Sequence, residues 1–307
     1  MSQPSPSQPT PSSNSIGFLF AVLAYGSWGL LPIYWKLFGT IPAVEVLSHR
    51  MIWSMVFLLG VLFLQKRLPE LAAVWASKKT LRFLIASACL LAMNWGLYIY
   101  GVNTDRVVET SLGYYINPLL TVMLGMIFLK ERLNRTQWFA VGLAALGVIN
   151  FIVDFGQVPW IALGLAFTFG LYGLLRKIVA IAPMVGLAVE TIVLAPLMLV
   201  FVTYWQLTGY GHLTTSSYTL LIFIGAGVVT SMPLLWFNNA AKRLRLSTMG
   251  FFQYIAPSLQ LILGVFLYAE PFTRTHAVTF ACIWTALAIY SANSFAMTRQ
   301  ASSAASD

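Results

Sequence analysis

Apolar residues form ten long, unbroken runs along the chain, and short polar stretches separate them. Their lengths are close to the roughly 17 to 25 residues that a helix needs to cross a bilayer. They do not alternate apolar and polar positions as the strands of a membrane barrel do. The pattern therefore predicts an all-α membrane protein with ten transmembrane helices, near residues 16–36, 42–64, 81–102, 107–129, 136–153, 158–180, 183–206, 217–240, 246–269 and 275–296.

A sequence repeat divides these helices into two halves. Residues 115–136 and 254–275 share nine identical positions, among them Pro118/Pro257, Gly125/Gly264, Glu131/Glu270 and Arg135/Arg274. Apolar composition alone does not explain why a proline, a glutamate and an arginine recur at one offset, and internal duplication is common in secondary transporters. We predict a first five-helix repeat over residues 16–153 and a second over 158–296. The polar tails at 1–15 and 297–307 are expected to be disordered.

Weaker matches extend the repeat toward the start of each half. Residues 25–31 resemble residues 169–175, and Trp95 aligns with Trp236. On the same alignment, Glu190 takes the position of His49.

The basic residues give the helices a direction. Fourteen of the 18 Lys and Arg residues fall in the even-numbered loops and the C-terminal tail, and the others are Lys36, Arg50, Arg106 and Arg274. Cytoplasmic loops carry such an excess, so both termini are predicted to be cytoplasmic. Because each half has five helices, the second repeat is then inverted relative to the first. Topology explains the net charge of +9, and we expect no nucleic-acid partner.

The composition excludes a soluble fold. Hydrophobic residues make up 59% of the chain and charged residues 9%, whereas soluble domains carry about 25% charged residues. Cys89 and Cys282 lie inside predicted helices, and no metal-ligand spacing surrounds either one. We expect no metal and no cofactor, and the expected partners are membrane lipid and a small-molecule substrate.

Small residues in the fifth helix would allow another helix to approach closely. The two interpretations are packing inside the protein and a homodimer interface. The residues concerned are Ala140, Gly142, Ala144, Ala145 and Gly147.

Ionisable side chains inside a bilayer are costly, so each is a functional candidate. Glu45 and His49 share one face of the second helix because they are four residues apart. Arg50 lies next to them, and Glu109 in the fourth helix is its best acidic partner. We predict that these four residues form a polar cluster at the periplasmic mouth. The cluster acts either as a gate or proton-coupling site, or as a fixed structural ion pair.

A further acid, Glu190, lies in the seventh helix, near its predicted cytoplasmic side. Pairing with Lys242 or Arg243 would make it an inner gate. Simple helix pairing is the competing interpretation.

The repeated prolines point to a central site. Pro118 and Pro257 each fall in the middle of a predicted helix, where proline removes a hydrogen bond and kinks the helix. Two inverted kinks at the midplane would surround a site with polar groups, as broken helices do in other transporters, or would only shape the packing. The predicted substrate-binding residues are Asn94, Tyr98, Tyr114, Tyr115, Asn117, Trp236, Asn239, Gln253 and Tyr254.

Five segments carry a family resemblance: residues 28–36 (WGLLPIYWK), 45–54 (EVLSHRMIWS), 94–100 (NWGLYIY), 109–118 (ETSLGYYINP) and 247–257 (STMGFFQYIAP). They resemble the drug/metabolite transporter superfamily with its EamA-type repeats, and within it the chloramphenicol-sensitivity, RarD-type branch. The resemblance runs from Ile16 to Phe295. It implies a bacterial inner-membrane permease with a central cavity between two five-helix halves, and it does not fix the cargo.

The expected function is a secondary transporter that moves a small organic solute, drug or metabolite by alternating access, with proton-coupled export as one mode. The alternative is an intramembrane enzyme acting on a lipid-linked substrate. The sequence lacks an H-E-x-x-H zinc helix and a G-x-S-x-G nucleophile turn, so no enzymatic activity is expected.

Overall fold

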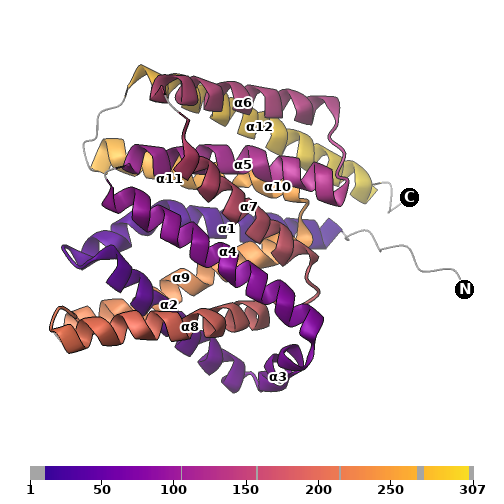
Figure 1. Cartoon of the computed structure of the whole chain (residues 1–307). Helices are drawn as coiled ribbons and strands as arrows, with labels where there is room; N and C mark the ends of the chain where they lie inside the picture. Colours follow the sequence, from indigo (N-terminus) through magenta and orange to yellow (C-terminus); the bar gives the residue numbers. More distant parts are fainter. Residues whose placement is uncertain (1–10, 105, 157, 214–215, 268–272, 304–307) are drawn as a thin grey trace, which may run out of the picture.

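The computed structural model describes residues 11–104, 106–156, 158–213, 216–267 and 273–303. These residues are helical and contain no strand. Ten of the helical spans are long and apolar enough to cross a membrane. The elements are α1 (Pro11–Trp35), η1 (Lys36–Phe38), α2 (Ala43–Leu64), α3 (Leu68–Ala76), α4 (Lys78–Asn103), α5 (Val107–Leu129), α6 (Arg135–Phe155), α7 (Trp160–Ile178), α8 (Pro183–Thr208), α9 (Ser217–Arg243), α10 (Leu246–Phe252), α11 (Ile255–Ile262), η2 (Leu263–Leu267) and α12 (Arg274–Ser303) (Figure 1).

The prediction of an all-α membrane protein with ten transmembrane helices is confirmed, but some boundaries differ. The first helix begins at Pro11, inside the segment expected to be a tail, and proline is well tolerated in a first helical turn. The last helix continues past residue 296 to Ser303. The added residues include Met297, Arg299, Gln300 and Ala301, which are good helix formers and extend an existing helix at little cost.

A short helix, α3, lies in the loop where no helix was predicted. It has nine residues, too few to cross a bilayer. Pro69 fits its first turn. Val74 is buried while Trp75 is exposed, so the helix lies along the edge of the bundle, where Figure 1 shows it between α2 and α4.

The ninth span is broken, whereas its repeat partner is continuous. A turn at Gln253 and Tyr254 separates α10 from α11, and a π-helical segment, η2, follows. The break comes four residues before Pro257, whose missing N–H cannot bond to the carbonyl of Gln253. The amide of Ala256 binds that carbonyl instead, at 3.3 Å. By contrast, α5 runs without interruption through Pro118, so the kink predicted there stays a prediction.

The helices pack as two inverted five-helix repeats. In the repeat, α1 corresponds to α7, α4 to α9, and α5 to α10 with α11. The contact of α1 with α9 is matched by that of α4 with α7, and the contact of α5 with α7 by that of α1 with α11. Three pairs join a helix to its own counterpart: α2 with α8, α5 with α10, and α6 with α12. A two-fold axis between inverted repeats requires this pattern.

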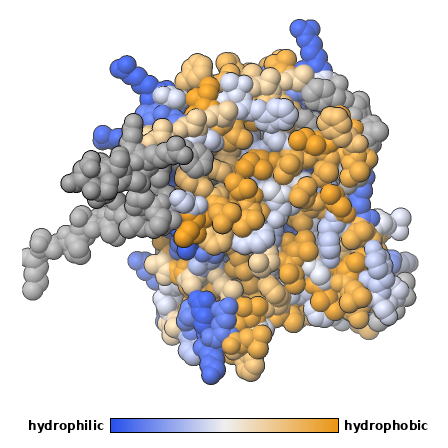
Figure 2. Space-filling model, turned by 180° about the vertical axis from the view of Figure 1, so that it is seen from behind, coloured by the Kyte–Doolittle hydropathy of each residue, from blue (hydrophilic) through white to orange (hydrophobic). Residues whose placement is uncertain are grey.

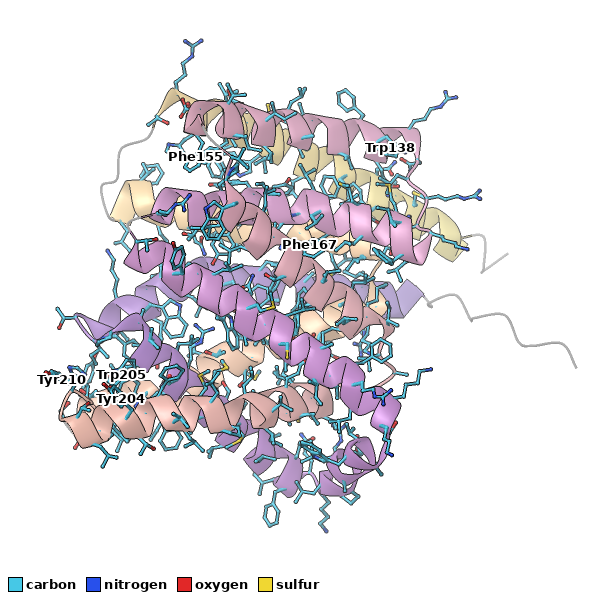
Figure 3. All side chains as sticks on the ribbon, in the orientation of Figure 1. Trp138, Phe155, Phe167, Tyr204, Trp205 and Tyr210 are labelled. Carbon is cyan, nitrogen blue, oxygen red and sulfur yellow. The ribbon has the colours of Figure 1, made fainter. Side chains whose placement is uncertain are left out.

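The bundle has two ends that differ in charge. The start of α1 and the end of α12 lie at one end in Figure 1, together with the connections at 65–77, 130–134, 179–182 and 244–245. These connections and the helix ends next to them hold most of the Lys and Arg residues. We call this the basic end. The far end is formed by the described parts of the connections between these helices, which are residues 39–42, 104, 106, 156, 158–159, 209–213 and 216. Figure 3 shows Tyr204, Trp205 and Tyr210 together at the far end and Trp138 at the basic end, as expected of aromatic residues at membrane interfaces.

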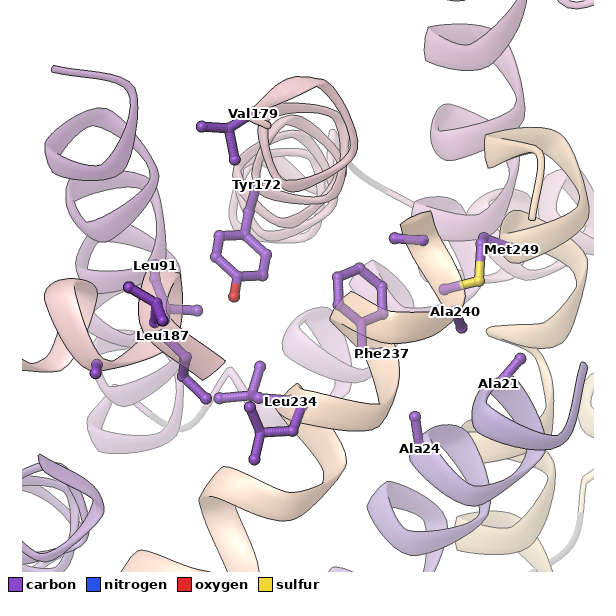
Figure 4. Packing of buried hydrophobic residues seen from close by; sticks show 14 of the residues in the cluster. Ala21, Ala24, Leu91, Tyr172, Val179, Leu187, Leu234, Phe237, Ala240 and Met249 are labelled. Carbon is purple, nitrogen blue, oxygen red and sulfur yellow. The ribbon is translucent and has the colours of Figure 1, made fainter. Parts of the chain in front are cut away.

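The two largest clusters of the core lie around α1, α4, α7, α8 and α9 and between α5, α6, α10 and α12. Figure 4 shows part of the large cluster, with Tyr172 and Phe237 between the helices. Apolar side chains also cover much of the outer face seen in Figure 2, as a bilayer-facing surface requires. Among the small residues of α6, Ala140 and Ala144 are buried in the second cluster and Gly147 lies against Thr279 and Cys282 of α12.

Candidate functional site

A cavity of about 470 Å³ lies between the two halves. Its volume is within the roughly 300 to 1,000 Å³ of small-molecule sites. Helices of both repeats form its wall, and the exposed residues Gly39 and Ala43 extend it to the far end. The residues singled out from the sequence that lie in this wall are Arg50, Asn94, Tyr98, Tyr114, Asn117, Gln253 and Pro257.

The differences between the repeats face the cavity. Tyr114 of α5 aligns with Gln253, and Asn117 with Ala256, and all four lie in the wall. Of the identical positions, Pro257 also lies in the wall, whereas Tyr115 and Tyr254 do not. Tyr115 packs on Phe151 and Phe280, and Tyr254 is buried in the same cluster between α5, α6, α10 and α12.

The amide side chains in the wall also hold helices together. Asn94 donates to the carbonyl of Leu165 at 2.9 Å, and Asn117 donates to the next carbonyl, Ala166, at 2.9 Å. Both bonds fix α7 against α4 and α5. Gln253 donates to Thr121 at 3.1 Å, which joins α5 to the turn after α10. The rotamers of these wall residues are therefore set by the fold before any solute enters.

Two further predicted residues lie outside the wall, on α9. Asn239 donates to the carbonyl of Leu235 and accepts from Arg243 at 2.9 Å. Trp236 packs against the large core cluster. These contacts serve the packing of α9 near the basic end.

Three of the residues predicted to form one cluster have different main contacts in the structure. Glu45 binds the loop between α8 and α9, accepting from the backbone N–H of His212 at 2.6 Å and facing its Nδ1 at 2.8 Å. The ring of His49 lies on Phe223, with centroids 4.1 Å apart. Arg50, one residue further round the helix, faces the cavity. The side chain of Glu109 lies outside the described residues.

The contact between Glu45 and His212 was not visible in the sequence. His212 belongs to a polar loop with no helical periodicity, and 167 residues separate it from Glu45. The one signal in the sequence was a glutamate at the start of an apolar helix, because a carboxylate that becomes buried there needs a hydrogen-bond partner.

Aromatic rings close the cavity on the side of the basic end. Tyr25, Trp28 and Phe169 lie in its wall, and behind them Phe237 and Tyr172 are fully buried. Trp28 lies 5.7 Å from both Phe169 and Phe237, and Phe237 stacks on Tyr172 at 6.0 Å, measured between ring centroids. We call these five residues the aromatic seal.

A buried ion pair lies beyond the seal. Arg176 Nη1 and Glu190 Oε1 are 3.4 Å apart, and both side chains are 0% exposed. Ser87 donates to Glu190 at 2.5 Å and Tyr172 donates to it at 3.3 Å. Arg176 Nε donates to Asn238 at 3.1 Å. We call this set the inner network, and it joins α4, α7, α8 and α9.

The inner network differs from the sequence prediction for Glu190, since its partner is Arg176 and not Lys242 or Arg243. Arg176 had been assigned to a loop, but it lies in the last turn of α7, where the end of the helix lets the side chain turn back into the bundle. Lys177 and Lys242 also turn inward at this end, and they donate to the backbone carbonyls of Leu244 and Val179.

Comparison with known proteins agrees with the architecture. Residues 15–153 match the EamA-like transporter family. A solved crystal structure of another protein, 18% identical, superposes with a TM-score of 0.69 over 91% of this chain and 97% of that one. At this identity the match concerns the fold alone.

Relatives from several bacteria are closer. The chain is 46% identical to an uncharacterized transporter of Vibrio cholerae, over 90% of this chain and 91% of that protein. It is 44% identical to protein RarD of Escherichia coli, over 89% and 93%. It is 43% identical to the uncharacterized transporter YojE of Bacillus subtilis, over 89% and 93%. The chain therefore belongs to the EamA-like transporter family, in its RarD branch, and is a multi-pass inner-membrane transporter.

Proposed function

We propose that this protein is a secondary transporter in which a small organic solute occupies the central cavity and crosses the membrane by alternating access. The observation that carries the proposal is the asymmetry of the cavity, which reaches the far end and is closed toward the basic end by the aromatic seal and the inner network. A cavity between inverted repeats, open to one side, is the arrangement that alternating access uses.

The charge distribution supports an orientation with the basic end and both termini in the cytoplasm. On this assignment the cavity faces the periplasm. The opposite state would close the far end and open the basic end, with the two halves exchanging conformations about their two-fold axis. The inner network and the aromatic seal would have to separate in that step.

The polar residues at the far end have a corresponding role in the proposal. Glu45 ties α2 to the loop before α9, and His49 lies against Phe223 of α9. Because α2 and α9 come from different halves, these contacts would move as the halves rock. Arg50 would contact the solute, together with Tyr98, Tyr114 and the amides of the wall.

Proton coupling stays a prediction, and Glu190 is its best-placed carrier. Leu91, Trp95, Thr230 and Leu234 lie both in the cavity wall and in the layer that covers Glu190. One layer of side chains thus separates this carboxyl group from the cavity. Glu190→Gln keeps the size and most hydrogen bonds of the side chain. It should abolish the effect of a pH gradient on uptake while leaving solute exchange intact, and Glu45→Gln is the control for loss of another buried acid.

Transport itself can be tested with purified protein in vesicles. Labelled amino acids, amines and chloramphenicol would be screened for uptake with and without a pH gradient. Leu47 lies in the cavity wall, whereas Leu146 is exposed on α6. We expect Leu47→Trp to block uptake of any solute that moves, and Leu146→Trp to leave uptake unchanged. If no solute moves, or if both variants transport equally well, the proposal is wrong.

A further inference from the structure

One charged side chain dominates the cavity. Among the wall residues that the structure describes, Arg50 is the one with a formal charge, and no aspartate or glutamate lies in the wall. No described carboxylate comes within ion-pair distance of its guanidinium group, and its buried Nε has no hydrogen-bond partner among these residues. The described part of the cavity wall therefore carries a net positive charge.

Two tryptophans hold this cation in place. The guanidinium carbon of Arg50 lies 5.1 Å from the ring centre of Trp35 and 5.3 Å from that of Trp95. Such cation–π contacts are stabilising, and more so when they are shielded from water. They fix the position of the group but do not neutralise its charge, because aromatic rings carry none. An arginine this deep in a membrane protein remains costly without an anion.

The neighbouring hydroxyl groups suit an anion as well. Tyr98 and Tyr114 also lie in the wall, near enough to Arg50 to interact with it electrostatically. A tyrosine hydroxyl can donate a hydrogen bond to an anionic oxygen, and guanidinium groups bind carboxylates through two parallel N–H bonds. Arginine and two tyrosines facing one space thus form a set of donors around a place for a planar acid group.

The rest of the wall is mostly apolar, in contrast to the hydrogen-bond donors around Arg50. Most of it is apolar or aromatic, with Trp28, Phe38 and Phe169 among its rings. The amide nitrogen of Asn94 is used by Leu165 and Thr168, and that of Gln260 by the carbonyl of Trp28. Their side-chain oxygens receive no hydrogen bond from the described residues and can accept one from a ligand.

We propose that the solute is an organic monocarboxylate with an apolar body, whose carboxylate binds Arg50. This inference rests on the proposed function for its cavity and adds the substrate class. A single positive charge matches a single negative one, whereas a phosphate dianion would leave about one charge uncompensated in a region of low dielectric constant. The apolar wall takes the body of the solute, and the free amide oxygens accept from any N–H or O–H group that it carries.

The test measures charge preference at constant shape. Purified full-length protein would be melted in the presence of matched triplets, each with one body as carboxylate, primary amide and amine: phenylacetate, phenylacetamide and phenethylamine, with indole and branched aliphatic bodies as second and third sets. We expect the carboxylate to raise the unfolding midpoint most in every triplet that binds, with an apparent affinity at least about tenfold above that of the amide, since losing a charged hydrogen-bonded pair costs about 1.5 to 3 kcal/mol.

Variants assign the preference to Arg50. Arg50→Gln should bind carboxylate and amide equally, and Arg50→Lys should retain part of the preference because it keeps the charge. The matched control is Arg106→Gln, since Arg106 also lies over a tryptophan, Trp160 at 5.2 Å, but is not in the cavity wall. If the amine or the amide stabilises the wild-type protein best, or if none of the triplets stabilises it, the substrate class is wrong. Side-dependent labelling of the cavity does not depend on the solute, and would still decide whether the protein alternates.

Discussion

The two ends of the central pathway are built from different kinds of polar contact. At the basic end, Arg176 and Glu190 are both 0% exposed and the other members of the inner network complete their hydrogen bonds. At the far end, Glu45 is 1% exposed but its partner His212 is 36% exposed. Breaking a fully buried pair is far more costly than breaking one that reaches solvent. We therefore expect the inner network to hold the basic end closed more firmly than the contact between Glu45 and His212 holds the far end.

The repeat sharpens this comparison. Glu190 corresponds to His49, and continuing the match of residues 25–31 with 169–175 places Arg176 opposite Pro32. The duplicated helices thus carry the ion pair in one copy only. In the proposed transport cycle, closing the far end would therefore use other contacts.

The largest effect is expected from Arg176→Met, which removes one partner of the buried pair. Glu190 would keep its charge with only hydroxyl donors, at a cost of about 3 to 5 kcal/mol. The unfolding midpoint in detergent should fall accordingly. The double variant Arg176→Met/Glu190→Met should recover most of the loss, because no unpaired charge remains.

A control for this prediction lies at the same end of the molecule. Arg67 and Glu70 form an ion pair at 2.6 Å whose side chains are 31% and 47% exposed. Arg67→Met should leave the midpoint nearly unchanged, because solvent screens an exposed pair. Equal losses in Arg67→Met and Arg176→Met would show that burial does not distinguish the two.

A smaller effect is expected from Phe237→Leu in the aromatic seal. Phe237 contacts Trp28, Phe169 and Tyr172, and the shorter side chain would leave part of this space unfilled. The expected loss of stability is about 1 to 2 kcal/mol, together with faster exchange of solute, since the seal is easier to open. Differential scanning calorimetry measures the loss of stability, and a solute-exchange assay measures the exchange rate. A slower exchange at reduced stability would contradict a gating role.

Apart from the control, the smallest loss of stability is expected from Glu45→Gln at the far end. The amide oxygen can still accept from the N–H of His212, so only the charged part of the contact is lost, about 1 kcal/mol. We expect a small shift in the midpoint and a larger fraction of protein with an accessible cavity. A loss as large as that of Arg176→Met would mean that the far end is locked as firmly as the basic end.

The sequence predicted the helices well because each one has to be apolar over a bilayer's thickness. Long-range polar pairs were less predictable, because no local pattern fixes which distant helix a buried acid will meet. Glu45 binds His212, although the helical spacing had placed it with His49. Glu190 binds Arg176, although Lys242 or Arg243 had been predicted. The sequence also could not predict that the helix of α10 and α11 is interrupted while α5 is continuous, since both repeats carry the proline.

The repeat nevertheless indicated where to look. Two unmatched pairs next to the prolines, Tyr114 with Gln253 and Asn117 with Ala256, lie in the cavity wall. Its shared glutamate, Glu131, accepts from the backbone N–H groups of Leu246 and Ser247 at 2.7 and 2.9 Å, at the start of α10. The matching residue Glu270 lies outside the described part of the chain. Shared positions such as Glu131 and Tyr115 therefore maintain the scaffold.

The most direct measurement of the central claim is side-specific labelling of Leu47→Cys in a protein whose Cys89 and Cys282 are replaced by alanine. A membrane-impermeant maleimide would be applied to either face of oriented vesicles. Our account predicts fast labelling from the side of the far end and slow labelling from the side of the basic end, with the second rate raised in the Arg176→Met/Glu190→Met background. Equal rates from both sides, or faster labelling from the basic side, would contradict it.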